Sequence, residues 1–156
     1  MGMSESILDA GKCELDTHAD TWCVGEHSLV LYDTGRTVTV SPFLESLGEV
    51  EKVSIVQAAI AYDDPNYSRT VVLIINQALH FPNMHRNLAC PNQSRVHGVE
   101  VFDTPRHLDP HRHELSHSIY FPSDKFAIPL HLDRVISYFH CRKPSQMRLI
   151  HVPISS

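Results

Sequence analysis

The chain has 156 residues, of which 42% are hydrophobic and 20% charged, and its formal net charge is −5 at pH 7. This length suits one domain with a buried core. The negative charge argues against nucleic-acid binding, because neutralising phosphates requires clustered Lys and Arg. No apolar run reaches the roughly 18 residues of a membrane-spanning helix. The polar N-terminal segment also lacks the features of a signal peptide.

The cysteines are widely separated, at Cys13, Cys23, Cys90 and Cys141. No C-x-x-C pair is present, which excludes a zinc ribbon and a thioredoxin-type motif. With no signal peptide, reduced thiols in an intracellular, cytoplasmic protein are the simplest interpretation.

Short β-branched runs bounded by turn residues predict an all-β domain. In chain order, the first strands are expected directly before Asp16, at 28–32 and at 37–40. Two long apolar runs follow, at 53–62 and 69–81, with a linker rich in turn-forming residues. They predict an antiparallel hairpin. Because the apolar residues are almost unbroken, we expect burial on both faces, as in a closed barrel or a sandwich.

The second half of the chain begins with a short helix, predicted for residues 92–97 and terminated by Gly98. Further strands are expected at 98–102, 117–121, 125–132 and 134–140. We therefore divide the chain into four segments by composition. These are an N-terminal extension (1–12), a core (13–102), a His- and Pro-rich loop (103–116), and C-terminal strands with a basic tail (117–156).

Two aspartates are candidates for acid–base chemistry. Aspartic peptidases hold two carboxyl groups about 3 Å apart that share one proton, so that one acts as base and the other as acid. Single-domain members supply one Asp per chain, followed by Thr or Ser and small residues, and a symmetric dimer completes the site. Asp33 begins the literal Asp-Thr-Gly motif, but Arg36 follows it where the dimer axis requires a small residue. Residues 33–36 also suit a hairpin turn, so we favour Asp16.

Several motifs around and after Asp16 occur together in one order. The chain reads ELDTHADTWC from Glu14, AYDDP from Ala61, IINQALHFPNMHRNLACPNQ from Ile74 and HSIYFP from His117. These motifs resemble those of copia-type retrotransposon polyprotein proteases, which carry LDSGAS where this chain has LDTHAD. The resemblance covers residues 13–144, most of the chain.

The resemblance implies a closed-barrel, retropepsin-like aspartic-protease fold with one short helix. It also implies a homodimer that cleaves its own polyprotein and needs no cofactor or metal. The catalytic carboxylate carries over to Asp16 and its bracing hydroxyl to Thr17. The flap over the substrate carries over to residues 43–53. The remaining loop and flap residues of the site carry over to His18, Ala19, Asp20, Ser46, Leu47 and Gly48.

The same resemblance assigns supporting roles to three later residues. Leu79 and Leu88 are expected in the core, and Asn87 is expected to fix the turn behind the loop of Asp16.

Two departures from the motif leave alternatives open. His18 replaces a glycine whose backbone N–H faces the carboxylates and which accepts conformations that a Cβ atom disfavours. Asp20 adds a third carboxyl group near the pair. One alternative is a catalytically inactive β domain that serves in dimerisation or peptide binding. Another is a metal-binding domain, because Asp16, His18 and Asp20 would share one face of an extended segment.

Overall fold

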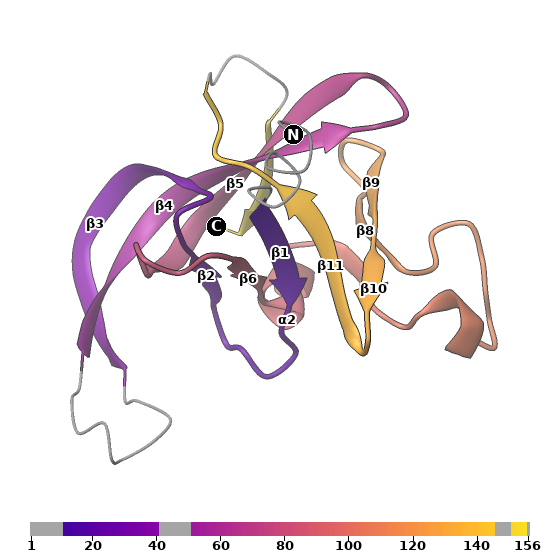
Figure 1. Cartoon of the computed structure of the whole chain (residues 1–156), viewed down its shortest axis with the longest axis horizontal. Coiled ribbons are helices and arrows are strands. Elements are labelled where there is room, and N and C mark those ends of the chain that lie inside the picture. The colour runs from indigo at the N-terminus through magenta and orange to yellow at the C-terminus, as the bar shows by residue number, and fades with distance from the viewer. Residues whose placement is uncertain (1–10, 41–50, 146–150, 156) are drawn as a thin grey trace, which may run out of the picture.

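The computed structural model of the chain describes residues 11–40, 51–145 and 151–155 (Figure 1). Strands make up most of these residues, and the only α-helix among them is the six-residue α2 (Pro91–Val96). The prediction of an all-β domain with one short helix is therefore confirmed. None of the helices in this part of the chain has the length and apolar composition needed to cross a membrane.

The larger sheet contains nine of the described strands, in the order β10-β11-β1-β6-β2-β5-β4-β3, with β12 joined to β5. Their bounds are β1 (Gly11–Leu15), β2 (Trp22–Val24), β3 (Leu29–Val40), β4 (Glu51–Asp64), β5 (Arg69–His80), β6 (Asn87–Ala89), β10 (His131–Asp133), β11 (Ile136–Cys141) and β12 (His151–Ser155). Closing a sheet into a barrel requires hydrogen bonds between its two end strands. Within the described residues β3 pairs with β4 and β10 with β11, so the expected closed barrel is not formed.

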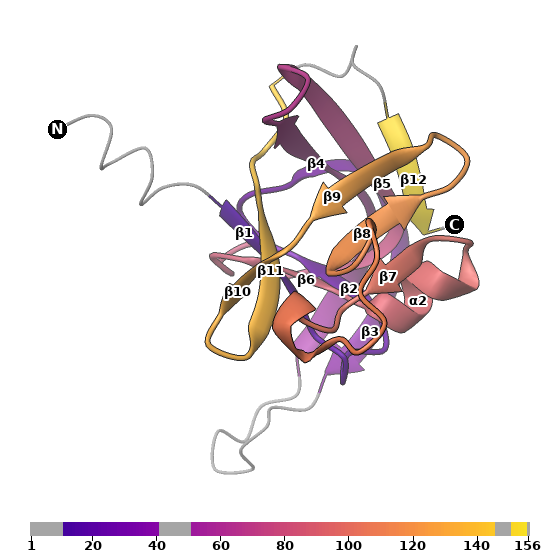
Figure 2. The same cartoon turned by 90° about the vertical axis from the view of Figure 1, so that its right-hand side faces the viewer.

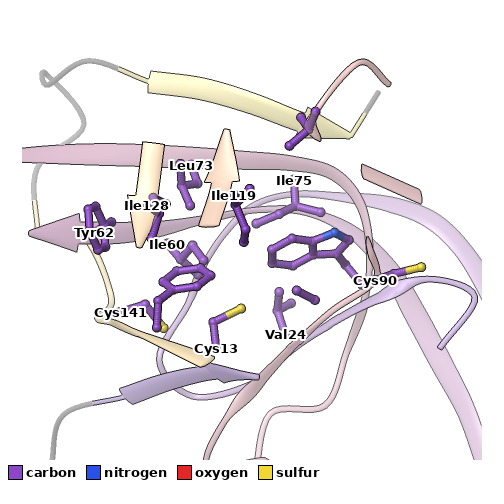
Figure 3. Close-up of a cluster of buried hydrophobic side chains, with 14 of the residues drawn as sticks. Cys13, Val24, Ile60, Tyr62, Leu73, Ile75, Cys90, Ile119, Ile128 and Cys141 are labelled. Carbon is purple, nitrogen blue, oxygen red and sulfur yellow. The ribbon is translucent and has the colours of Figure 1, made fainter. Parts of the chain in front are cut away.

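A smaller sheet is made of β7 (Glu100–Phe102), β8 (Ser118–Phe121) and β9 (Phe126–Pro129), in that order. Seen from the side in Figure 2, it covers part of the larger sheet. Ile119 and Ile128 of the small sheet share one buried cluster with Ile60 of β4 and Leu73 of β5 (Figure 3). The burial of these aliphatic side chains between two layers is the main favourable contribution to folding.

The long hairpin predicted from the sequence is confirmed. β4 and β5 pair antiparallel from the turn at Asp64 and Arg69 down to Ser54 and His80. Residues 58–62 and 71–73 are all buried. Because successive side chains of a strand point to opposite faces, such unbroken burial means that both faces are covered, as expected.

The predicted hairpin turn at residues 33–36 is wrong. These residues lie inside β3, where Asp33 and Thr37 both pair with β4 across an irregular step in the register. The extra residues form a bulge in which Gly35 has φ +78°, a conformation that favours glycine. The Oδ1 atom of Asp33 accepts from the N–H of Gly35 at 2.9 Å, and the Thr34 hydroxyl donates to a β4 carbonyl at 2.7 Å. Asp33 and Thr34 thus stabilise the bulge, and the strand continues.

The short helix is confirmed within one residue of its predicted bounds. Pro91 occupies its first turn, where a missing N–H costs nothing, and Cys90 caps it. The Sγ atom of Cys90 accepts from the backbone N–H of Gln93 at 3.3 Å. Gly98, at φ +88°, follows the helix and lets the chain turn into β7. The loop expected at 103–116 contains only a 3₁₀ turn, η2 (Arg106–Leu108).

The C-terminal part of the chain contributes to the larger sheet. β11 pairs antiparallel with β1, with Phe139 opposite Cys13, and β12 pairs parallel with β5. Asp16 directly follows β1, so β11 lies beside the candidate loop although more than a hundred residues separate them in sequence.

Candidate functional site

The loop that carries Asp16 connects β1 to β2, and β6 lies between these two strands. β1 runs parallel to β6, and β2 runs antiparallel to it. The loop therefore leaves the sheet on one side of β6 and returns on the other side, next to the start of α2 (Figure 1). This arrangement places the loop next to residues 89–93, at the end of β6 and the start of α2.

Three hydrogen bonds attach the loop to these residues. The backbone N–H of Asp16 donates to the Ala89 carbonyl at 3.0 Å. The Cys90 thiol donates to the carbonyl of Ala19 at 2.9 Å. The backbone N–H of Trp22 donates to the Oε1 atom of Gln93 at 2.8 Å. Both ends and the middle of the loop are therefore fixed to β6 and α2.

Trp22 holds the end of the loop in place through its buried side chain. Its side chain is fully buried, and its indole N–H donates to the Ser94 hydroxyl at 3.0 Å. That hydroxyl in turn donates to the Cys90 carbonyl at 3.0 Å. A buried indole with a satisfied N–H stabilises both the core and the position of the loop that ends beside it.

Asp16 and His18 form a tight local turn. The backbone N–H of His18 donates to the Oδ1 atom of Asp16 at 3.0 Å, and the N–H of Ala19 donates to the Asp16 carbonyl at 3.2 Å. The side chain of His18 is exposed. In the described chain, the residues other than glycine with positive φ are Ser68, His117, Lys125 and Arg134. His18 is not one of them, so the turn does not need a glycine there.

Asp16 lines a pocket of about 340 Å³ at the surface. The other lining residues come from the same loop, from β1, β6 and β11, and from the connections before β8 and β11: Glu14, Leu15, Thr17, His18, Leu88, Asp103, Val135, Ile136 and Ser137. Arg86 donates to both carboxylate oxygens of Glu14, at 2.8 and 3.0 Å. The Nη2 atom of Arg95 lies 3.6 Å from the Oδ1 atom of Asp103. Within the described residues no ion pair involves Asp16, so its carboxylate is available to a ligand.

A second pocket, of about 330 Å³, also borders the loop. It is lined by Thr17, Ala19, Asp20, Cys90, Asn92, Gln93, Val96 and His97. Thr17 lines both pockets, so the loop forms a ridge between them. The structure thus brings the five predicted loop residues, 16–20, to one surface feature. The predicted flap residues Ser46, Leu47 and Gly48 lie outside the described residues.

Asn87 is completely buried. Its Oδ1 atom accepts from the backbone N–H of Gly25 at 2.9 Å, and its amide donates to the His27 carbonyl at 3.4 Å. It therefore fixes the turn that follows β2.

Leu79 and Leu88, both expected in the core, are only half-buried. Side chains alternate along a strand, and at these places the neighbours Ala78 and Ala89 point into the core. Leu88 instead faces the pocket of Asp16.

The metal-binding alternative has no ligand set among the residues that the structure describes. No group of three His, Cys, Asp or Glu side chains in the described ranges is placed to hold a metal ion. Asp16, His18 and Asp20 would share a face only in an extended segment. They lie in a turn, which directs their side chains differently.

Cys23, next to the loop, is not suited to nucleophilic chemistry. Burial, with smaller contributions from the charges of Asp16 and Cys90, raises the pKa of its thiol to about 11. A thiol with this pKa is protonated at neutral pH, and only the thiolate is a good nucleophile.

Four pocket residues from distant segments escaped the sequence analysis: Asp103, Val135, Ile136 and Ser137. No local pattern connects them with Asp16. The proximity of Val135, Ile136 and Ser137 depends on the pairing of β11 with β1, and Asp103 directly follows β7. Comparisons of the chain with models of protein families, with curated proteins and with solved structures gave no match.

Proposed function

We propose that this chain is an aspartic endopeptidase that processes the polyprotein of a copia-type retroelement, as a homodimer with one catalytic Asp16 per copy. One observation carries the proposal. The carboxylate of Asp16 lies at a pocket of about 340 Å³, on a loop pinned to β6 and α2, with a backbone N–H on one of its oxygens. The motifs shared with copia-type proteases support the same assignment.

In this mechanism two Asp16 carboxyl groups share one proton, since two like charges about 3 Å apart cannot both remain ionised. The ionised carboxylate accepts a proton from a water molecule as the water oxygen attacks the scissile carbonyl carbon. The other carboxyl group donates its proton to the carbonyl oxygen, which gives a gem-diol. The C–N bond then breaks as the leaving nitrogen receives a proton and one hydroxyl of the diol returns to a carbonyl.

The proposal includes a retropepsin-like fold. It is supported by the succession of β1, the Asp16 loop, β2, the long hairpin, β6 and one short helix. A polypeptide substrate, without nucleic acid, membrane or cofactor, completes the proposal. The four free cysteines are consistent with a reducing, cytoplasmic setting.

A second candidate is a catalytically silent domain that binds peptides or dimerises. His18 favours it, because an imidazole replaces the small motif residue at the ridge where two copies would meet. This candidate shares the pocket and the dimer with the first, and it differs only in lacking turnover.

The test compares Asp16→Asn with Asp33→Asn, a matched exposed aspartate that serves the bulge in β3. Both variants are checked for folding by circular dichroism and for dimer formation by light scattering. Each is then incubated with a peptide library whose cleavage is followed by mass spectrometry. We expect Asp16→Asn to lose about 10²- to 10⁴-fold in turnover and Asp33→Asn to lose nothing.

Retained turnover in Asp16→Asn would remove the assignment. A parent chain that dimerises and binds peptides without cleaving any would establish the silent domain instead.

A further inference from the structure

The turn between β10 and β11 exposes an aliphatic side chain beside the candidate site. Val135 is 90% exposed and Ile136 42% exposed, and both line the pocket of Asp16. Large apolar residues exposed together next to a pocket are a recurrent property of binding surfaces.

The turn is a tight one. Asp133 pairs with Ile136, so only Arg134 and Val135 connect the two strands, and Arg134 has φ +59°. Two-residue hairpin turns favour Gly, Asn and Asp at such positions. Arg134 and Val135 go against this preference, and the exposed Val135 gains no packing in return. Such a departure is expected where a residue serves a function.

The turn is also held in place. Ser137, the next residue of β11, is buried, and its hydroxyl lies 2.8 Å from the Nε2 atom of the buried His117. The strand then pairs with β1, which leads directly into Asp16. Val135 and Ile136 are thus attached to the same rigid part of the sheet as the carboxylate.

The charges around the pocket indicate what it accepts. Glu14 and Asp103 are both paired with arginines, as described above, so neither presents an uncompensated charge to a ligand. The remaining walls include four aliphatic side chains, those of Leu15, Leu88, Val135 and Ile136. A large apolar side chain gains free energy against these four aliphatic walls, whereas a charged one loses hydration against them.

We propose that the β10–β11 turn is the specificity element of the site. In this role Val135 and Ile136 form the wall that receives a large apolar side chain of the substrate, next to the bond that Asp16 attacks. The inference rests on the proposed function, because it takes the Asp16 pocket as the substrate site. The occupant is a polypeptide side chain, and a second copy of the chain is the competing occupant.

The experiment uses the full chain with Val135→Glu, Ile136→Ala and Leu108→Glu. Leu108 is a matched control, since it is an aliphatic residue of the η2 turn, 64% exposed, outside the Asp16 pocket. Cleavage preference is read from a positional-scanning octapeptide library. Binding of the same library is measured in an Asp16→Asn background, where nothing needs to be cleaved. Light scattering reports the dimer.

We expect Ile136→Ala to lower kcat/KM for peptides with Leu or Phe beside the cleaved bond by about tenfold. Val135→Glu should shift the preference toward Lys and Arg, and Leu108→Glu should leave it unchanged. An unchanged preference with cleavage still dependent on Asp16 overturns the inference but not the proposed function. Val135-dependent binding of apolar peptides without Asp16-dependent cleavage overturns the function but not the inference.

Two other outcomes also overturn the inference. If no peptide is bound or cleaved, both proposals fail. If Val135→Glu weakens the dimer and leaves the peptide preference unchanged, the exposed turn belongs to the contact between copies.

Discussion

The backbone nitrogen of His18 lies 3.0 Å from the Oδ1 atom of Asp16, and its N–H donates to that oxygen. A backbone N–H directed at the carboxylates is what the glycine supplies in the protease motif that this loop resembles. Here a histidine supplies it, without the positive φ that would demand glycine. Compared with the glycine of the motif that it resembles, His18 therefore differs in the side chain at the ridge but not in the backbone donor at Asp16.

This relationship leads to a test with two substitutions at one position. His18→Ala retains the N–H, and an exposed site of this kind is expected to change the free energy of unfolding by no more than about 0.5 kcal/mol. Its turnover should remain close to that of the parent. His18→Pro removes the N–H, so kcat should fall, because a hydrogen bond to a charged group contributes about 1.5–3 kcal/mol. Equal kcat values in two folded variants would show that this donor has no part in the reaction.

Asn87 should be important for stability although it lies outside the proposed chemistry. Asn87→Ala leaves the buried N–H of Gly25 without its acceptor. We expect the free energy of unfolding, measured by urea titration, to fall by about 1–3 kcal/mol. Asn83→Ala, at an exposed position of the preceding turn, is the matched control and should have little effect. A loss at Asn87 no larger than that of the control would contradict this role.

His117 should make the fold sensitive to mild acid. Burial, followed by the charge of Arg106, lowers the pKa of His117 in the folded state. In the unfolded chain a histidine has its ordinary pKa of about 6.5. Between this value and the lower pKa of the folded state, the unfolded state binds more protons than the folded state. The contribution of neutral His117 to the free energy of unfolding is therefore present above a pH of about 6.5 and is lost as the pH falls toward the lowered pKa.

The measurement for His117 is urea unfolding at several pH values between about 5 and 8. His117→Asn should show a smaller loss of stability on acidification, since asparagine tolerates φ +55° and does not titrate. His140, whose pKa is also lowered by burial, keeps part of the pH dependence in this variant. The exposed His111→Gln is the control. Identical pH profiles for the parent and His117→Asn would refute the prediction.

Cys13, Cys23 and Cys141 should resist alkylation in the folded chain. Burial raises the pKa of the Cys141 thiol to about 12 and that of Cys23 to about 11, and it also raises the pKa of Cys13. Only thiolates react rapidly with iodoacetamide. Mass spectrometry after treatment at pH 8 should therefore show little labelling of these three cysteines in the native chain and complete labelling in urea. Rapid labelling of Cys23 in the native chain would show that its thiol is more accessible or more acidic than the structure indicates.

The features that the sequence predicts correctly are local ones. Unbroken apolar runs around a turn-forming linker are sufficient to identify the β4–β5 hairpin, because strand pairing across a short turn depends on neighbouring residues. Likewise, Pro91 at the start and Gly98 after the end delimit α2, since these residues act on the backbone conformation at their own positions.

Local signals are also ambiguous where two structures use the same residues. Asp33 to Arg36 suit a hairpin turn, yet they form a bulge within β3. The choice depends on whether the flanking segments pair with each other or both pair with β4. Which of these two pairings forms is decided by the contacts of the whole sheet and not by residues 33–36.

Composition, strand content, the long hairpin, the short helix and Asp16 as a candidate could be taken from the sequence alone, because each depends on residues close together in the chain. The open order of the strands and the position of Val135 and Ile136 beside Asp16 could not. They depend on the antiparallel pairing of β11 with β1, a contact between distant segments that only the packing of the complete sheet selects.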